Sequence, residues 1–263
     1  MSGNPLVRLG RYTVAGIEEL GYMASLFLES LYWILLGKRL QQPVQISAVF
    51  QEAMQIGVSA IPIVAVLAFA VGVMLAIQSI ETLKTFGAES KVIIGIALSV
   101  TREFSALIVG ILVAGRSGSA ITARIGSMME AQEIDALRVI GIHPVRYLVA
   151  PIMLAMLLMV PTLTVLADFM GIFGGAVFSA PSLSMSIDVY LHRTLDVLVV
   201  DDIRQGLVKS VVFAVIIALV GVSNGFQVRG GAEAVGRATT RSVVLAISII
   251  VIVDMLFTYF MNR

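Results

Sequence analysis

Residues 53–80 contain no charged side chain, and this one stretch limits what the chain can become. A helix needs about 20 consecutive apolar residues to cross a hydrocarbon core about 30 Å thick. The stretch is long enough, and the rest of the sequence has the same character: 58% of the residues are hydrophobic and 13% are charged. Soluble domains average about 25% charged residues. The sequence therefore predicts an all-α, polytopic integral membrane protein.

Four further stretches have the length and apolar character of membrane spans. They cover residues 92–115, 147–178, 210–228 and 242–261. The stretch 147–178 would make a helix of about 48 Å, which is too long for one ordinary span and too short for two spans with a turn. We expect one long helix that bends at Pro161, because proline disrupts the helix interior. The sequence thus predicts five transmembrane helices.

Residues 20–37 are also apolar, but they do not predict a sixth span. Basic residues flank this segment on both sides, and they favour the cytoplasm at both of its ends. The flanking residues are Arg8, Arg11, Lys38 and Arg39. We therefore expect a helix that lies flat in the membrane interface, with Tyr32 and Trp33 at headgroup depth.

The distribution of lysine and arginine gives a topology for the five spans. The segments predicted to be cytoplasmic are 1–52, 116–146 and 229–241, and they hold most of the basic residues. The predicted outer loop 179–209 is acidic, and its part 186–200 has the apolar spacing of an interfacial helix. We expect a single domain over residues 1–263, with an N-terminal cytoplasmic and interfacial region (1–52) and a transmembrane core (53–263).

The stretch EIDALRVIGIHPVRYL, residues 133–148, is amphipathic and lies between the predicted second and third spans. Its apolar residues recur at near-helical spacing, which predicts a short helix with one apolar stripe. The stripe would comprise Ile134, Leu137 and either Val139 or Ile140. Gly141 and Pro144 supply the signals that end a helix. Two interpretations stay open: a surface helix resting on the membrane or on its own protein, and a peg that docks into a cytoplasmic partner.

Arg102 and Glu103 fall at mid-membrane depth in the predicted second span, where each charge costs roughly 2.5–3.5 kcal/mol on the insertion scale. Adjacent residues do not face each other on a helix, so each side chain needs a partner of its own. One interpretation is an interhelical ion pair between Arg102 and Asp254. The other is a polar lining of a lipid cavity, in which Arg102 attracts a phosphate headgroup. Asp168 is expected at the outer interface, in contact with solvent.

Several kinds of chemistry lack the residues that they need. The sequence has no cysteine, and its two histidines, His143 and His192, are too far apart for a convincing zinc site. It has no GxxxxGK[ST] phosphate loop, so we do not expect this chain to hydrolyse ATP itself. Its basic residues are scattered instead of forming the stripe typical of nucleic-acid binding. We expect no metal, no cofactor on this chain and no nucleic-acid partner.

Two blocks of sequence closely resemble one family. They are AGRSGSAITARIGSMMEAQEIDALRVIGIHPVRYLVAP at 114–151, and LVKSVVFAVIIALVGVSNGF at 207–226 together with GRATTRSVV at 236–244. Both resemble MlaE-type permeases, the membrane subunits of ABC transporters that work with MCE-domain lipid-binding proteins. The resemblance extends over about residues 50–262.

The resemblance implies partners and site residues. The helix between the second and third spans would be a coupling helix on a separate ATPase subunit, which would bind ATP and Mg²⁺. A second copy of the chain, a hexameric MCE-domain protein and a lipid substrate would complete the assembly. The residues expected at the ATPase contact are Glu133, Ile134, Asp135, Leu137, Arg138, Ile140 and Gly141. The residues expected along the lipid path are Leu75, Ile77, Gln78, Ile80, Arg102, Glu103 and Asp254.

Together these observations predict the permease subunit of an ATP-driven transporter in the bacterial inner membrane. It would move phospholipid or a related hydrophobic molecule between that membrane and a periplasmic MCE carrier. Two alternatives stay open: an intramembrane lipid-modifying enzyme centred on Arg102, Glu103 and Asp254, and a scaffold that moves nothing. The enzyme lacks a nucleophile and a base at workable spacing. Substituting Arg102 and Glu103 separates transport from scaffolding, because a scaffold should keep its cellular function.

Overall fold

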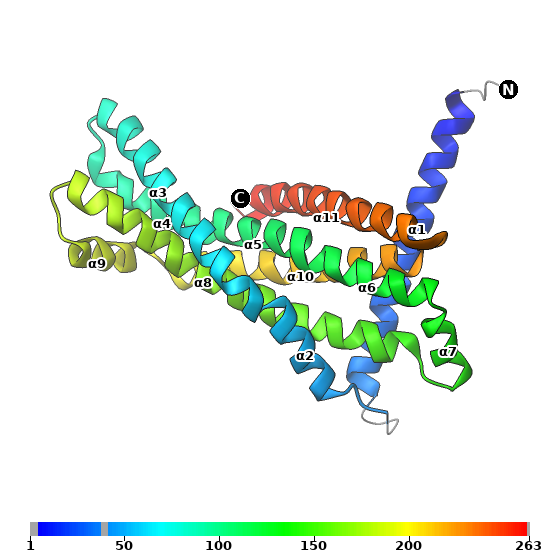
Figure 1. The fold of residues 1–263 in the computed structure, drawn as a ribbon. Helices are drawn as coiled ribbons and strands as arrows, with labels where there is room; N and C mark the ends of the chain where they lie inside the picture. Colours follow the sequence, from blue (N-terminus) through cyan, green and yellow to red (C-terminus); the bar gives the residue numbers. More distant parts are fainter. Residues whose placement is uncertain (1–4, 38–41, 262–263) are drawn as a thin grey trace.

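The computed structural model describes the backbone of residues 5–37 and 42–261, and the side chains of these residues except 5–9, 11, 12, 15 and 90. Every regular element in this part of the chain is helical (Figure 1). The α-helices are α1 (Pro5–Leu36), α2 (Ile46–Ile56), α3 (Ile61–Thr85), α4 (Val92–Ser99), α5 (Ser105–Val113), α6 (Ser119–Glu130), α7 (Glu133–Val139), α8 (Ala150–Ser182), α9 (Ile187–Val197), α10 (Val200–Phe226) and α11 (Gly231–Met261). Short 3-10 turns, η1 (Val58–Ala60) and η2 (Glu89–Lys91), and π turns, η3 (Val100–Phe104), η4 (Ala114–Gly118) and η5 (Val145–Val149), join or interrupt them.

Five helical segments are long and apolar enough to cross a membrane, which confirms the predicted number. They are Ile46–Thr85, Val92–Glu130, Val145–Ser182, Val200–Phe226 and Gly231–Met261. The third contains α8, which continues through Pro161 as one long helix; the expected bend at Pro161 stays a prediction. The fourth begins at Val200 instead of Ser210. It therefore takes in Asp202 and Lys209, which were predicted to lie in the outer loop.

Helix α1 lies across the bundle instead of along it (Figure 1). It contacts η5, α10 and α8 near the end of the bundle that carries α7, which we call the α7 end; α9 marks the opposite α9 end. This transverse course agrees with the predicted interfacial helix, although α1 already begins at Pro5. Tyr32 is exposed and Trp33 is partly buried. The basic residues used to predict this position lie outside the description: Lys38 and Arg39 entirely, Arg8 and Arg11 in their side chains.

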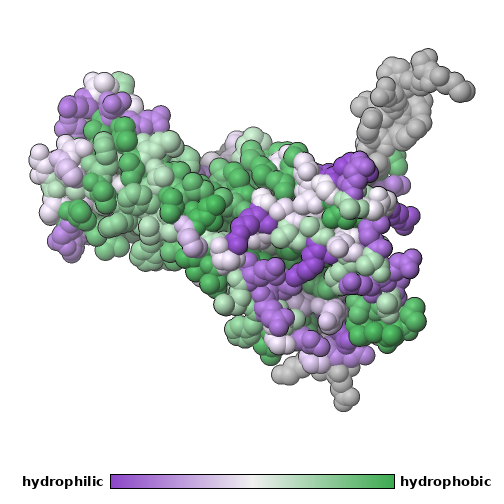
Figure 2. Space-filling model, in the orientation of Figure 1, coloured by the Kyte–Doolittle hydropathy of each residue, from purple (hydrophilic) through white to green (hydrophobic). Residues whose placement is uncertain are grey.

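Helix α8 is the centre of the bundle. It packs against α2, α3, α5 and α10, and many of its apolar side chains are fully buried. On the face drawn in Figure 2, the surface is mostly apolar along the middle of the bundle, and hydrophilic residues gather toward its two ends, more of them toward the α7 end. Helix α11 is the least covered span, because only 11% of its most apolar window is buried within the chain. A membrane or a second protein must cover such a surface.

Glycines bring α3 and α8 to backbone distance. A Cβ atom on Gly72 would overlap the backbone of Gly171, and one on Gly174 would overlap the backbone of Phe69. Small residues at helix crossings allow this close approach in membranes, where van der Waals packing drives helix association. The crossing fixes the first span against the central helix.

We expect Gly72→Ala to lower the midpoint of thermal unfolding in detergent, because α3 and α8 must separate to admit a methyl group. Gly95→Ala is the matched control, since nothing lies within 4 Å of a Cβ atom at that position. Alanine favours a helix over glycine by roughly 0.8–1.0 kcal/mol, so the control should be as stable as the parent or more stable. Equal midpoints for the two variants would contradict the close crossing.

Candidate functional site

The second span carries its charged pair on a π turn. Residues Val100–Phe104 form one wider turn within an otherwise α-helical segment, and such turns are frequent at functional sites. Helix α10 approaches this turn closely, because a Cβ atom on Gly206 would overlap the carbonyl oxygen of Thr101. The turn therefore brings Arg102 and Glu103 within reach of α10.

Arg102 pairs with Asp202 in the first turn of α10. Its Nε and Nη2 atoms lie 2.7 and 2.6 Å from Asp202 Oδ1. The other oxygen of Asp202 accepts a 3.0 Å hydrogen bond from the backbone N–H of Val199, which caps the start of α10. The expected ion pair between Arg102 and Asp254 is therefore wrong. Asp254 has a different partner, since α10 supplies a cation of its own.

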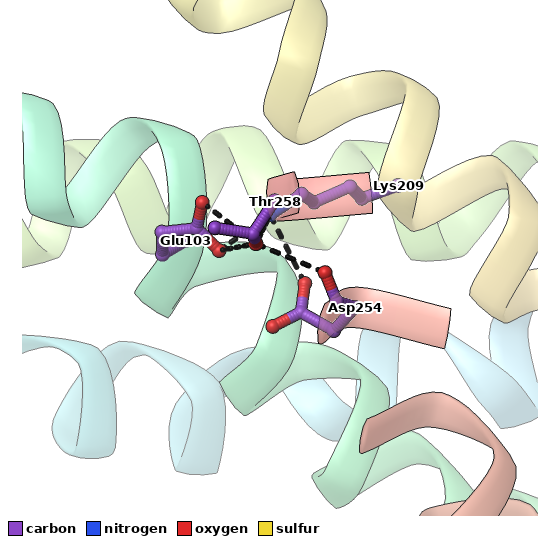
Figure 3. Close-up of polar contacts among 4 residues, drawn as sticks. All are labelled: Glu103, Lys209, Asp254 and Thr258. Atoms are coloured by element: carbon purple, nitrogen blue, oxygen red, sulfur yellow. Dashed lines mark hydrogen bonds and ion pairs between the residues drawn. The ribbon is translucent and has the colours of Figure 1, made fainter. Parts of the chain in front are cut away.

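That cation is Lys209, at which the second, fourth and fifth spans meet (Figure 3). Its ammonium group forms ion pairs with Glu103 and, at 3.1 Å, with Asp254 Oδ1. It also donates a 3.0 Å hydrogen bond to the hydroxyl of Thr258, which in turn donates to Glu103. Two hydrogen-bond acceptors, Glu103 and Thr258, and the nearby charge of Asp254 surround the ammonium group, which explains how a lysine is accommodated inside a span.

We call the six residues Arg102, Glu103, Asp202, Lys209, Asp254 and Thr258 the polar cluster. It is closed on one side and open on the other: the side chains of Asp202 and Lys209 are 1% exposed, whereas those of Arg102 and Glu103 are 33% and 30% exposed. The open edge therefore presents a guanidinium and a carboxylate within an apolar surface. Such an edge can bind a polar headgroup by charged hydrogen bonds while apolar side chains contact acyl chains. Within the described residues, no group of three or more His, Asp or Glu side chains could hold a metal ion.

Sequence reasoning identified three members of the polar cluster but missed Asp202, Lys209 and Thr258. The available signal was the spacing of Asp202 and Lys209, which are seven residues apart and so lie two turns apart on one face of a helix. Asp202 and Lys209 at this spacing can pair with Arg102 and Glu103 on the second span. The sequence prediction instead places these charges outside the fourth span, at its boundary.

The four α3 residues predicted along the lipid path fall into two pairs. Leu75 and Ile80 are partly buried against the small core around Ile96. Ile77 and Gln78 are exposed, Ile77 to 39%. The exposed pair is accessible to a ligand, and the role of all four residues in lipid binding stays a prediction.

Asp168 is buried, so the expectation of a solvated side chain is wrong. The residue is 8% exposed, and its Oδ1 atom has no hydrogen-bond partner within the described part of the chain. The prediction placed Asp168 at the end of its span by counting the rise from the inner end. Helix α8 continues to Ser182, so neighbouring helices still surround Asp168.

The short helix predicted at the α7 end is present as α7, and Gly141, with φ at 80°, lies in the turn that ends it. Its apolar stripe differs from the prediction. Ile134 is fully buried against the body of the protein, whereas Val139 and Ile140 are 86% and 68% exposed. Glu133, Asp135 and Arg138 are exposed, and Leu137 is partly exposed. Helix α7 is thus anchored by Ile134 and presents its last apolar residues outward.

Side chains of the segment after α7 contact α1 and the residues that follow it. His143 Nε2 lies 3.1 Å from Glu29 Oε1, and the imidazole ring packs 5.4 Å from the indole of Trp33. The guanidinium of Arg146 lies over the same indole at 5.6 Å and donates a 2.6 Å hydrogen bond to Gln42. A cavity of about 550 Å³ separates α1 from α7 beside these contacts.

Comparison with known proteins finds one family and several relatives. The family described as Permease MlaE matches residues 49–260. A probable ABC transporter permease protein of Rickettsia typhi is 33% identical over 250 residues, which cover 95% of each chain. The intermembrane phospholipid transport system permease protein MlaE of Haemophilus influenzae is 30% identical over 207 residues, which cover 78% of this chain and 79% of that one. The chloroplastic protein TRIGALACTOSYLDIACYLGLYCEROL 1 of Arabidopsis thaliana is 34% identical over 190 residues, which cover 72% and 54% of the two chains.

Proposed function

Because this chain belongs to the MlaE permease family, we propose that it is a membrane permease that moves phospholipids or related hydrophobic molecules. It works in the bacterial inner membrane, exchanging lipid with a periplasmic MCE-domain carrier. The observation that carries the proposal is the open edge of the polar cluster. Charges at span depth are costly in lipid and usually face protein, water or a transported ligand. Arg102 and Glu103 are exposed enough to bind a lipid headgroup there.

A separate ATPase subunit supplies the energy and holds ATP and Mg²⁺. It binds the exposed end of α7, where Val139 and Ile140 present apolar surface to the cytoplasm. Apolar side chains on a short projecting helix are the usual anchors when a helix docks into a groove of a partner. The charged residues Glu133, Asp135 and Arg138 surround these anchors and favour one orientation of the partner.

The contacts between α1 and the segment after α7 transmit the movement of the ATPase. His143 and Arg146 both engage Trp33 of α1, so a shift of α7 pulls on the interfacial helix as well as on α8. Docking of the ATPase on α7 then moves both α1 and α8. This linkage couples ATP hydrolysis at the α7 end to the polar cluster deeper in the bundle.

Two further partners complete the assembly. A second copy of the chain covers apolar surface that the bundle leaves open, chiefly on α11. The MCE-domain carrier, a hexamer, binds at the α9 end, where α9 forms a separate amphipathic helix after the third span. Lipid then passes between the polar cluster and the carrier on the side opposite to the ATPase.

Ile140→Asp tests the docking step. Tagged parent and variant chains are purified from native membranes in mild detergent, and the bound proteins are identified. We expect the ATPase to accompany the parent and to be lost from the variant, because a carboxylate replaces an apolar anchor. Ile187→Asp is the matched control: this isoleucine is 43% exposed on α9, at the opposite end. Retention of the ATPase by Ile140→Asp, or its absence from a folded parent, would contradict the proposal.

A second candidate function has one contact in its favour. The Thr258 hydroxyl lies 3.0 Å from Glu103 Oε2, the arrangement of a hydroxyl nucleophile and its base, so an intramembrane enzyme acting on lipids has a possible centre. Incubating the purified chain with phospholipid and measuring released fatty acid or headgroup separates the two functions. We expect no release. Release by the parent that stops in Thr258→Val would establish the enzyme instead.

A further inference from the structure

A small basic cavity lies at the α7 end, away from the polar cluster. It has a volume of about 130 Å³ and lies between α2 and the second half of the second span. The residues that matter here are Glu52, Gln55, Ile56, Arg116, Ser117 and Arg124. Fourteen residues separate Arg116 from Arg102, which corresponds to roughly 21 Å along the span. The cavity is therefore a separate feature and not a part of the polar cluster.

The π turn η4 forms one wall of this cavity. Arg116 and Ser117 belong to η4, whereas Arg124 follows in α6, and side chains from both elements line the same space. The Ser117 hydroxyl is 3.5 Å from the carbonyl oxygen of Ile56, at the limit of a hydrogen bond. The wider turn thus places a cation and a weakly engaged hydroxyl next to α2.

The cavity has an excess of positive charge. Arg124 Nη2 lies 2.6 Å from Glu52 Oε1, and its Nη1 lies 3.4 Å from Gln55 Oε1. The Nε atom of Arg124 is buried without a hydrogen-bond partner within the described residues. The side chain of Arg116 is exposed and makes no ion pair or hydrogen bond with any residue that the structure describes. Two guanidinium groups and one carboxylate therefore line the cavity, the carboxylate pairs with Arg124 alone, and donors are left for an anion.

The surroundings identify the anion as a lipid phosphate. Helix α2 begins the first candidate membrane span, so lipid lies beside the helix that forms one wall of the cavity. Phe50 and Met54, on the face of α2 that points away from the cavity, are 69% and 59% exposed. Basic pockets between transmembrane helices on the cytoplasmic side bind anionic headgroups. Arginine suits this ligand because its planar donors match phosphate oxygens. We propose that Arg116, Ser117 and Arg124 bind the phosphodiester of an inner-leaflet phospholipid, at a second lipid site near the ATPase side.

Lipid binding by the full-length chain tests this site. The chain is stripped of lipid in dodecyl maltoside, and binding of phosphatidylglycerol is followed by native mass spectrometry. We expect Arg116→Gln to weaken one binding event by about tenfold, as when one charged hydrogen bond is lost. Its unfolding midpoint should equal that of the parent, because the side chain of Arg116 has no partner in the described chain. Arg204→Gln is the control, since Arg204 is a 71% exposed arginine in α10.

A parallel titration with sodium phosphate separates the two possible sources of the phosphate group. We expect millimolar phosphate to leave phosphatidylglycerol bound, because the acyl chains contribute to affinity. Displacement of the lipid by phosphate would assign the cavity to a free anion and overturn the lipid assignment. Unchanged affinity of Arg116→Gln for phosphatidylglycerol would overturn the site itself.

Discussion

Replacing Lys209 by methionine should destabilise this protein more than any other single change in the polar cluster. The substitution keeps the length and apolar stem of the side chain but removes its charge. It leaves the carboxylates of Glu103 and Asp254 without the cation between them. Removing one partner of a buried ion pair costs about 3–5 kcal/mol. Thermal unfolding in detergent should show a much lower midpoint.

Two further variants separate the charge effect from a general sensitivity to mutation. Lys84→Met is the control, because Lys84 is exposed at the end of α3 and should tolerate the change. Combining Lys209→Met with Glu103→Gln and Asp254→Asn should recover much of the lost stability, since no unpaired charge then remains. A Lys209→Met chain that unfolds at the temperature of the parent would contradict the ion pairs at Lys209.

The second large effect is expected at Ile134, the anchor of α7. Ile134→Asp places a carboxylate where the native side chain is fully buried, and the cluster of apolar residues around it offers no partner within the described residues. A buried charge without a partner is among the few changes that cost more than about 4 kcal/mol. Helix α7 should then detach from the bundle, and limited proteolysis should cut between the second and third spans.

Ile140→Asp is the matched control for this prediction, because Ile140 is 68% exposed on the same structural unit. It should leave the proteolysis pattern of the parent unchanged while abolishing ATPase binding. The two isoleucines thus separate the two roles of α7, anchoring and docking. Equal protease sensitivity of both variants would contradict this division.

The number and order of the spans could be predicted because apolar length alone decides which helices can cross a bilayer. The short helix after the second span could be predicted as well, from its period and from Gly141. The orientation of this helix could not be predicted. Periodicity shows that one face of a helix is apolar, but it does not show which apolar residues pack against the rest of the protein. The structure assigns Ile134 to the interior and leaves Val139 and Ile140 outside.

The ion pairs of the polar cluster depend on contacts between residues 45 to 106 positions apart, and no local pattern records such contacts. Arg102 and Glu103 could be identified as candidates because charges inside a span are unusual. Their partners could not be predicted, because a boundary of the fourth span placed at the first charge leaves Asp202 and Lys209 outside that span. Asp202 and Lys209 lie inside that span since opposite charges on the second and fifth spans compensate them. A span boundary predicted from the first charged residue is wrong wherever a neighbouring helix carries a charge of opposite sign that pairs with that residue.

The most direct test is lipid transfer by the reconstituted assembly. The chain is placed in liposomes with its co-purified ATPase and the MCE-domain protein, and a fluorescent phospholipid is followed between the bilayer and the carrier. We expect transfer that requires hydrolysable ATP in the parent and stops in Ile140→Asp, although that variant stays folded. Transfer at the same rate without ATP, or no ATP-dependent transfer by a stable parent assembly, would contradict an ATP-driven lipid permease.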